Sequence, residues 1–437
     1  ANALNVEMFV ARISTEGELD WLKFFAQSPE TIANHSITSD SQGNILLSGY
    51  FTGQWTVSPD YVLGNPSGFY SFREAFVLKL SPDGELLWAN ASLHTLGGVE
   101  NFGLARSWAI ATDQNDDVLI GGFFQDTIKF GNTLLVPTNG VSIQPYGAKL
   151  DGSTGAFQWV FAHFQQNLGG FATTYGLEVD DANNIYAIGG IDGPTTIDGT
   201  LYTPPGNSDL VVQKLDPAGN QQWIKIIGTD DSMSSDWGTK VLYRAPDQLY
   251  LYGNLNDHVA IDGTTYSNNG LRDVCLIQTD LEGTVQEVEF IGGEGAEASY
   301  DAAFDHNGDL FVITATNSPE FTLGAETVAL DTNLRHVVMG KWCRSPSAVD
   351  PIPSQTEWTL YPNPCSDYLG VSRSGSAVPA QQVLLWDAYG RLVKQMEVSV
   401  SSDHLEIPLG NETPGLYILE MRSSDGQVLQ KQSFIKI

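Results

Sequence analysis

The chain has 437 residues, enough for two or three domains, and its 21 basic residues against 52 acidic ones give a net charge of −31. This charge excludes nucleic acid and anionic lipid as partners, because both need basic patches to neutralise phosphate. Hydrophobic residues make up 42% and charged residues only 17%, with 44 Gly and 20 Pro, so the composition predicts an all-β fold with true cores. The sequence has no run of 18 apolar residues and no signal-peptide pattern, and it begins Ala-Asn-Ala-Leu without a Met, as is typical of a processed mature protein.

The first recurring element is an apolar strand, a tight turn and a second strand that carries Trp. One copy reads 76–80, then Ser-Pro-Asp-Gly, then 85–88 ending at Trp88. Further copies lie at 9–13 with Trp21, 146–150 with Trp159 and 211–215 with Trp223, with weaker copies at 275–279 and 336–342. The basic marker position of the first strand is occupied by Arg12, Lys79, Lys149, Lys214, Gln278 and Lys341, which are 67, 70, 65, 64 and 63 residues apart. We name these two strands c and d.

Between these copies lies a second recurring pair of strands, a and b. Each pair is an apolar alternation, a polar turn rich in Asp, Asn and Gly, and a second apolar strand, which predicts a β-hairpin. The pairs occur at 37–49, 110–121, 177–189, 241–253 and 304–312. In the fourth pair the acidic turn is replaced by Arg244-Ala-Pro-Asp247.

Each repeat therefore supplies four antiparallel strands, and repeated four-stranded sheets stack radially in a β-propeller. We predict a propeller over residues 1–343 with five blades of 63–70 residues, six being the alternative. The N-terminal strands are expected to complete the last sheet. One c strand is then left over, either as an extra edge strand or as an edge that pairs with another subunit.

The repeats resemble the secreted bacterial propeller repeats of the SBBP type. The shared pattern of an acidic residue, Gly-Asn and a Gly-terminated strand stands here as Asp40…Gly43-Asn44…Gly49 and as Asp180…Asn184-Ile-Tyr186…Gly189. The resemblance covers about residues 6–343 and implies the fold, but these repeats share no activity.

The repeats stop at Trp342, and residues 344–356 contain three prolines without apolar periodicity, as is typical of a linker. Residues 357–437 then show seven short strand patterns. Seven alternating strands in this length predict a small immunoglobulin-like β-sandwich. The patterns run over 358–361, 368–372, 383–387, 392–398, 405–408, 416–421 and 428–437.

This last segment resembles the type A C-terminal sorting domain of type IX secretion cargo. The resemblance rests on Leu360-Tyr-Pro-Asn-Pro364, on Trp386–Val393, on Pro414–Tyr417 and on the terminal stretch Lys431–Ile437. The motif residues that it singles out are Tyr361, Pro362, Asn363, Pro364, Asp387, Gly390, Gly415, Tyr417 and Lys436. It implies export through the periplasm and outer membrane, and as partners the outer-membrane translocon with its shuttle and attachment machinery. The protein is then released or held at the cell surface.

The three cysteines are Cys275, Cys343 and Cys365. Cys343 and Cys365 stand 22 residues apart across the linker, so a disulfide between them is plausible in an oxidising compartment. The alternative is three reduced thiols, with Cys275 buried in an apolar strand.

No catalytic motif is present in the sequence, and the seven histidines are scattered without metal-ligand spacing, so we expect neither an enzyme nor a bound cofactor. Two turns, Asp113-x-Asn115-x-Asp117 and Asp305-x-Asn307-x-Asp309, alternate oxygen ligands as a Ca²⁺ loop does. They lack the glutamate of such a loop, and the favoured interpretation is a tight turn stabilised by Asp and Asn.

Aligned on their turn Asp, or on Gly238 for the fourth repeat, the repeats place an aromatic residue or His where every strand a begins. These candidate ligand-binding residues are His35, Trp108, Tyr175, Trp237 and Tyr300. The innermost strands of a propeller line its channel, so the five side chains should form a ring at one mouth. The loops expected nearby carry His94, His163, Asp230, Asp231, Glu294 and Glu297. Aromatic rings beside carboxylates suit a glycan; the alternative is that the rings plug the mouth and hold the blades together.

Three functional hypotheses follow. The first is a non-enzymatic binding or adhesion module that presents its loop-rich face to a glycan or a surface protein. The second is a structural subunit of a surface complex or filament that self-associates through the spare strand. The third is a polysaccharide hydrolase or lyase.

Overall fold

Strands make up every regular element of the computed structural model, which confirms the all-β prediction. The structure describes residues 8–14, 17–25, 31–64, 72–95, 103–137, 142–166, 170–229, 235–305, 308–324, 326–330, 334–342, 358–361, 365–373, 381–387, 391–398, 404–410, 412–413, 415–423 and 428–436. Over these ranges, no helix has the length and apolar character needed to cross a membrane. The chain divides into two compact units, Ala1–Arg344 and Ser345–Ile437, and the predicted linker 344–356 lies outside the described residues.

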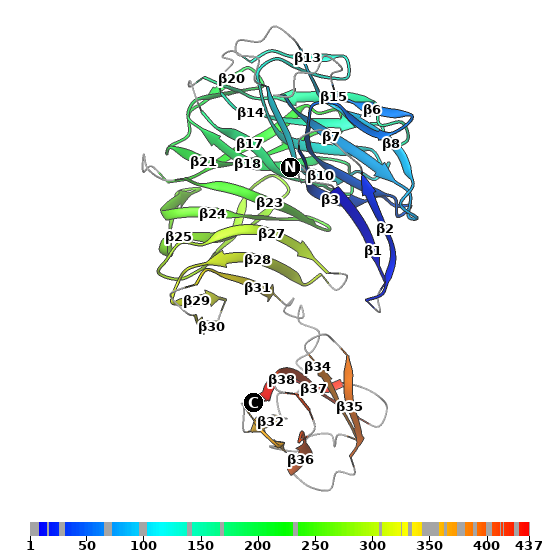
Figure 1. Ribbon diagram of the computed structural model, residues 1–437. Coiled ribbons are helices and arrows are strands. Elements are labelled where there is room, and N and C mark those ends of the chain that lie inside the picture. The colour runs from blue at the N-terminus through cyan, green and yellow to red at the C-terminus, as the bar shows by residue number, and fades with distance from the viewer. Residues whose placement is uncertain are drawn as a thin grey trace. The chain divides into compact units, whose positions relative to one another are not determined.

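The first unit repeats one antiparallel sheet in the strand order a-b-c-d (Figure 1). Sheet 1 consists of β3 (Ile32–Ser39), β4 (Ile45–Thr52), β7 (Arg73–Leu80) and β8 (Leu86–Ala91). Sheet 2 consists of β10 (Leu104–Thr112), β11 (Val118–Gln125), β14 (Gln144–Leu150) and β15 (Phe157–Ala162). Sheet 3 consists of β17 (Ala172–Val179), β18 (Ile185–Asp192), β21 (Ser208–Leu215) and β22 (Gln221–Ile227). Sheet 4 consists of β23 (Trp237–Arg244), β24 (Gln248–Ile261), β25 (Thr264–Asp280) and β26 (Val285–Ile291).

Sheet 5 has three described strands, β27 (Ala298–Phe304), β28 (Leu310–Thr316) and β31 (His336–Trp342). Short strands between b and c, or between d and a, form small additional sheets beside the repeats. These are β5 (Trp55–Ser58) with β6 (Tyr61–Leu63); β12 (Ile128–Phe130) with β13 (Thr133–Leu135) and β9 (Leu93–His94); β19 (Thr195–Ile197) with β20 (Thr200–Tyr202) and β16 (Phe164–Gln165); and β29 (Glu320–Leu323) with β30 (Glu326–Ala329).

The c strands of sheets 1 to 4 are apolar on both faces because each is covered by a neighbouring sheet on either side. In β7, Phe76 and Leu78 pack in a core together with Met8 and Val10, which precede sheet 1 in the chain. The alternate residues of β7, Ala75 and Val77, pack into the next core with sheet 2. This double burial explains why the c strands read as continuous apolar runs, whereas a half-exposed strand would alternate.

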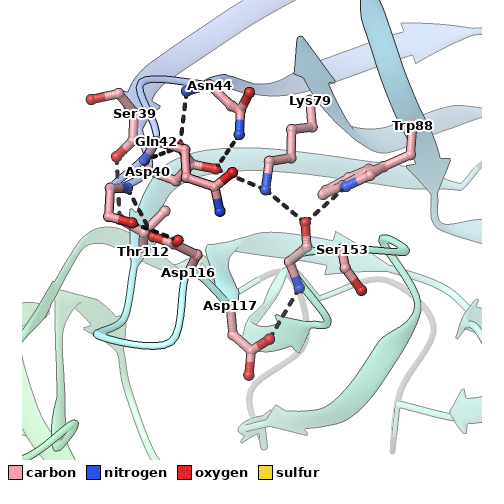
Figure 2. A network of polar contacts seen from close by, with 12 residues as sticks. Ser39, Asp40, Gln42, Asn44, Lys79, Trp88, Thr112, Asp116, Asp117 and Ser153 are labelled. Atoms are coloured by element: carbon pink, nitrogen blue, oxygen red, sulfur yellow. Dashed lines mark hydrogen bonds and ion pairs between the residues drawn. The ribbon is translucent and has the colours of Figure 1, made fainter. Parts of the chain in front are cut away.

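Adjacent sheets are joined by a repeated polar contact, which we call the turn latch. Lys79 Nζ and Trp88 Nε1 both donate to the carbonyl oxygen of Gly152, in the c–d turn of the next sheet, at 2.7 and 3.1 Å. Figure 2 shows Lys79 between this turn and Asp40, whose carboxylate it meets at 2.8 Å. Lys214 and Trp223 of sheet 3 reach Leu281 of sheet 4 in the same way, at 3.2 and 3.1 Å. The basic marker and the Trp of the repeat therefore hold sheet 1 to sheet 2 and sheet 3 to sheet 4, whereas Trp159 Nε1 of sheet 2 has no hydrogen-bond partner among the described residues.

The N-terminal hairpin, β1 (Met8–Ile13) and β2 (Leu19–Phe25), does not complete the last sheet, so that prediction is wrong. The position beside β28 is filled by β31 along its whole length, and β1 pairs with β2 in a sheet of their own. Arg12 and Trp21 make the turn latch to the carbonyl oxygen of Pro82 in sheet 1, at 3.2 and 3.1 Å. The hairpin thus lies against sheet 1 as a c–d pair that precedes it in the series, beside β3 in Figure 1.

The second unit consists of two sheets around one core, and all seven predicted strands are confirmed. Side chains of both sheets meet in this core, among them Leu369, Val383 and Leu419. One sheet contains β32 (Trp358–Tyr361), β33 (Tyr368–Arg373) and β36 (His404–Pro408). The other contains β35 (Leu392–Glu397), β34 (Gln382–Asp387), β37 (Gly415–Arg422) and β38 (Val428–Lys436).

The turn latch leads to a stability prediction. Lys79→Ala should lower the free energy of unfolding by about 3–5 kcal/mol, because it leaves the buried Asp40 carboxylate without its cation. Lys23→Ala is the matched control: it removes the exposed 2.6 Å ion pair with Glu85 and should cost less than about 1 kcal/mol. Urea denaturation of both variants measures the difference. Equal losses would contradict a structural role of the buried pair.

Candidate functional site

The five a strands meet around one cavity of about 440 Å³. β3, β10, β17, β23 and β27 each contribute side chains to its wall. All five candidate residues of the sequence analysis line this cavity, namely His35, Trp108, Tyr175, Trp237 and Tyr300. The structure therefore brings together residues that are spread over more than 260 positions of the chain. We call this cavity the ring pocket.

Each a strand carries a β-bulge at the ring pocket. His35, Trp108, Tyr175 and Tyr300 are the extra residues that have no partner in the pairing register with strand b. A bulge re-aims the side chain of the extra residue away from the regular alternation. The shared irregularity explains why the four side chains all reach the cavity.

The fourth repeat corrects the sequence alignment. Its bulged residue is Thr239, between Gly238 and Lys240, and Trp237 lies two positions earlier. The alignment was anchored on Gly238 because the turn of this repeat has no Asp in register. Counting five residues back from Arg244, which stands in the place of that Asp, would have found Thr239. Trp237 nevertheless lines the ring pocket.

One side of the ring pocket is an aromatic stack. The rings of His35 and Trp108 lie parallel, with centroids 3.9 Å apart and an interplanar angle of 9°, and Trp108 meets Tyr175 at 5.9 Å. His35 Nδ1 lies 3.0 Å from the carbonyl oxygen of Ser107. Burial lowers the pKa of His35 below its ordinary value and raises the pKa of Tyr175 to about 12, so both rings are held in their neutral forms.

The other side of the ring pocket is more polar and more open. Lys240 and Asp301 form an ion pair at 3.2 Å, and the hydroxyl groups of Thr239 and Ser299 are hydrogen-bonded to each other. The side chain of Tyr300 is 55% exposed. This half of the wall can therefore offer an open ring face together with a cation, an anion and hydroxyl groups to a bound molecule.

The loop residues expected beside the ring lie elsewhere. His94 is buried against Glu74, with 3.0 Å between Nδ1 and the carboxylate, and Glu297 accepts hydrogen bonds from Thr316 and Ser318 at 2.6 and 2.5 Å. His163 is buried, Glu294 borders a separate cavity, and Asp230 and Asp231 lie outside the described residues. The carboxylate that lines the ring pocket is Asp301, which sequence reasoning did not single out.

Sequence reasoning also missed a repeated buried polar contact at the start of each c strand. The residue five positions before the marker is Glu74, Gln144, Asp209 or Asp273. Glu74 accepts from the backbone N–H of His94 at 2.8 Å and Gln144 from that of Gln165 at 2.5 Å, so each holds the loop that enters the next sheet. Burial, with Glu297 beside it, raises the pKa of Asp273 to about 8. These residues could have been found in the sequence from their constant distance of five positions before the marker.

The two candidate Ca²⁺ turns hold lysine side chains and turn amides. Asp113 Oδ1 accepts from the backbone N–H groups of Asn115 and Asp117, and its other oxygen lies 2.7 Å from Lys149 Nζ. Lys341 lies 3.5 Å from Asp305 and 2.8 Å from Asp309, while Asn307 is outside the described residues. Across the described ranges, no three His, Cys, Asp or Glu side chains are grouped so as to hold a metal ion.

The sorting-motif residues are distributed over strand ends in the second unit. Tyr361 ends β32, Asp387 ends β34 and Gly415 begins β37. The Tyr417 ring stacks on Phe434 at 5.8 Å, and its hydroxyl donates to the carbonyl oxygen of Thr413 at 2.7 Å. Lys436 is buried in β38. Four motif residues lie outside the described residues: Pro362, Asn363, Pro364 and Gly390.

The predicted disulfide cannot be followed in the structure, because Cys343 lies outside the described residues, and it stays a prediction. Cys365 is buried, and burial raises the pKa of its thiol. Cys275 is buried in β25 as expected, and burial raises its pKa as well.

The buried His163 leads to a pH prediction. Burial lowers its pKa from 6.5 to about 4, so between these pH values the unfolded chain binds a proton that the folded chain does not. The wild type should lose on the order of 3 kcal/mol of stability over this interval relative to His163→Gln. Denaturant midpoints measured at pH 7, 5.5 and 4.5 test this, with the exposed His258→Gln as the control that should follow the wild type. Parallel curves for all three proteins would contradict the prediction.

Comparison with solved structures finds distant likenesses. A protein of unknown function from Bacteroides caccae aligns over 82% of this chain and 89% of its own, at 10% identity and a TM-score of 0.28. PorZ, a surface component of the type IX secretion system of Porphyromonas gingivalis, aligns over 92% of this chain and 59% of its own, at 13% identity and a TM-score of 0.24. At these values no activity is transferred to this chain.

Comparison with curated proteins finds an uncharacterized WD repeat-containing protein of Acanthamoeba polyphaga mimivirus, 29% identical over 135 residues. The match spans 29% of this chain and 9% of the relative. The family model described as the secretion system C-terminal sorting domain matches residues 359–436, which contain all the described residues of the second unit except Trp358. Residues 359–436 are therefore a C-terminal sorting domain, and the chain is secreted by the type IX system to the cell surface or the extracellular space.

Proposed function

We propose that the chain is a non-enzymatic binding module that presents the ring pocket to a glycan at the cell surface. The carrying observation is that five separate strands, each through the same bulge, direct side chains into one cavity. Its volume of about 440 Å³ lies in the range of small-molecule sites. Side chains from all five sheets thus line one cavity instead of packing against another sheet or in a core.

The chemistry of the wall supports a saccharide. Sugar rings present C–H faces that pack on aromatic rings and hydroxyl groups that need polar partners. Tyr300 offers an exposed ring, and Lys240 with Asp301 offers a cation and an anion beside it. The stacked rings of His35 and Trp108 pack the sheets together, which is the role that the plug interpretation gives them. We therefore assign packing to this side of the pocket and glycan binding to the side of Tyr300.

The pocket lining argues against the alternative of a polysaccharide hydrolase or lyase. Glycoside hydrolysis uses two carboxyl groups about 5–9.5 Å apart on either side of the scissile bond. Asp301 is the carboxylate among the lining residues, and it is ion-paired with Lys240. The neighbouring carboxyl groups of Asp273 and Glu297 are fully buried and are not part of the lining. We therefore propose no reaction, cofactor or Ca²⁺ at this site.

We also propose that the first unit is a β-propeller and that the second is an immunoglobulin-like sandwich. The a-b-c-d strand order of the sheets and the convergence of their a strands on one pocket support the propeller. The five sheets that contain an a–b pair, with the N-terminal hairpin as a further c–d pair outside them, favour the alternative of six blades over five.

A second candidate function, a structural subunit that assembles through an unpaired strand, is supported by the separate sheet of the N-terminal hairpin. The sorting domain implies contact with the type IX translocon and its attachment machinery during export. Either function would be exercised after that step.

The glycan proposal is tested by binding to a glycan array, followed by titration calorimetry with the best ligand. Tyr300→Ala should weaken binding at least tenfold, about 1.4 kcal/mol, because it removes the exposed ring of the pocket. Tyr368→Ala, an exposed tyrosine of the sorting domain, is the matched control and should bind as the wild type does. Two results together would refute the proposal: no binding to any glycan on the array, and a lowered melting temperature of Tyr300→Ala. The aromatic residues would then only close the mouth of the cavity and hold the sheets together.

A further inference from the structure

A second, smaller cavity adjoins the ring pocket, and we call it the side cavity. It has a volume of about 190 Å³. Its wall contains three aromatic side chains and three side chains with a hydroxyl group, namely Phe171, Tyr175, Trp237, Thr173, Ser208 and Ser235. Tyr175 and Trp237 also line the ring pocket. The two cavities are therefore neighbours that share these two rings as a common wall.

The side cavity lies where sheet 3 has only small side chains. In each sheet, the residue two positions before the bulge of strand a pairs with a residue of strand b. The pair is Ala33 with Tyr50 in sheet 1, Arg106 with Phe123 in sheet 2 and Thr173 with Gly190 in sheet 3. A large aromatic ring fills the b position in the first two sheets, whereas Gly190 has no side chain and lines the side cavity. The substitution of this ring by glycine leaves the space open.

Trp237 of sheet 4 forms the opposite wall of the side cavity. A Cβ atom at position 190 would lie 3.3 Å from that of Trp237, so the glycine lets the tryptophan approach sheet 3 closely. The guanidinium carbon of Arg272 lies 4.9 Å from the centroid of the Trp237 ring, and Arg272 Nε donates to the carbonyl oxygen of Glu297 at 3.0 Å. This cation–π contact holds the indole in place. Trp237 therefore offers a fixed ring on which a ligand can stack.

The wall of the side cavity also contains a buried hydroxyl group that lacks a partner. Thr173 is 1% exposed, and its Oγ1 makes no hydrogen bond to any described residue. Ser208 Oγ has one long contact, 3.5 Å to the carbonyl oxygen of Asp236. Leaving a buried hydroxyl unpaired is unfavourable, and native proteins satisfy most such groups. A hydroxyl group of a ligand in the side cavity would supply the missing partner.

The lining of the side cavity favours an uncharged ligand. None of its described lining residues is charged. The stretches 167–169 and 230–234, which flank Phe171 and Ser235 in the chain, lie outside the described residues, and their sequences contain no Lys or Arg. An anionic sugar would find no cation among these residues to balance its charge. Aromatic rings with hydroxyl groups instead suit a neutral sugar, which has an apolar ring face and hydroxyl groups of its own.

We propose that the side cavity is a second sugar subsite and that the glycan has at least two units. One unit lies in the ring pocket against Tyr300, and the next, a neutral sugar, stacks on Trp237 and directs a hydroxyl group to Thr173. The inference rests on the proposed glycan binding and deepens it, because it specifies the length of the glycan and the charge of its second unit.

The probes for the test are neutral disaccharides and the monosaccharides that they contain. Cellobiose, maltose, lactose, mannobiose and N,N′-diacetylchitobiose, with glucose, galactose, mannose and N-acetylglucosamine, are titrated into the full chain by calorimetry. At least one disaccharide should bind about tenfold more tightly than its monosaccharides, because its second unit gains the contacts of the side cavity.

Two variants act on the side cavity alone, since neither Phe171 nor Thr173 lines the ring pocket. Phe171→Ala should weaken disaccharide binding about tenfold and Thr173→Val about two- to tenfold, while both leave monosaccharide binding unchanged. Phe24→Ala is the matched control for the partly exposed Phe171, because Phe24 is also exposed and lines neither cavity. It should bind as the wild type does.

Melting curves without sugar give a second, independent readout. Thr173→Val should melt no lower than the wild type, because a methyl group replaces a hydroxyl group that has no partner. A lower melting temperature would show that the hydroxyl is already satisfied in the free protein, and this would overturn its role in the subsite.

The outcomes separate the subsite from the glycan proposal itself. Monosaccharide binding that Tyr300→Ala weakens, with no disaccharide bound more tightly, would overturn the subsite and leave the glycan proposal standing. Tighter disaccharide binding that Phe171→Ala does not alter would do the same. If no saccharide of the panel binds, the glycan proposal fails and the subsite fails with it.

Discussion

One kind of contact, the turn latch, joins the N-terminal hairpin to sheet 1, sheet 1 to sheet 2 and sheet 3 to sheet 4. A backbone carbonyl in the c–d turn of one sheet accepts hydrogen bonds from the marker cation and from the Trp of the sheet before it, as Gly152 does from Lys79 and Trp88. The Lys79 ammonium group is also paired with the buried Asp40, so removing either partner would leave a charge away from water. The latch therefore ties strand c to its own a–b turn and, at the same time, to the neighbouring sheet.

The ring pocket depends on this stacking rather than on any loop. Because each sheet is held in the same relation to the next, the bulges of the a strands fall around one point. His35 and Trp108 come from different sheets, yet their rings lie 3.9 Å apart. The same regularity places the N-terminal hairpin before sheet 1 and leaves its outer face and that of β31 without a described neighbour. The glycan binding that we propose at the pocket thus depends on how the sheets stack.

Much of the fold could be read from the sequence because the repeat has a recurring feature in most of its strands. The marker cation, the Trp and the turn Asp identified the strands of sheets 1 to 3, sheet 4 was found from its apolar alternation despite Gln278 and Arg244, and the seven strands of the sorting domain were found from alternation alone. The loop residues His94 and Glu297 were placed wrongly, because burial against Glu74 and Thr316 depends on where a loop folds back. Nothing in their local sequence separates a buried polar contact from an exposed loop tip.

The sequence by itself determined the repeated strands, the acidic surface and the sorting domain, since each is encoded by residues close together in the chain. Only the tertiary structure decided that Trp237 lines the ring pocket although Thr239 is the bulged residue of its strand, because the wall is formed by five strands from distant parts of the chain. It likewise decided where the N-terminal hairpin goes. A c–d pair looks the same in the sequence whether it closes the last sheet or begins a new one, and the choice rests on β31 pairing with β28 and on Arg12 reaching Pro82.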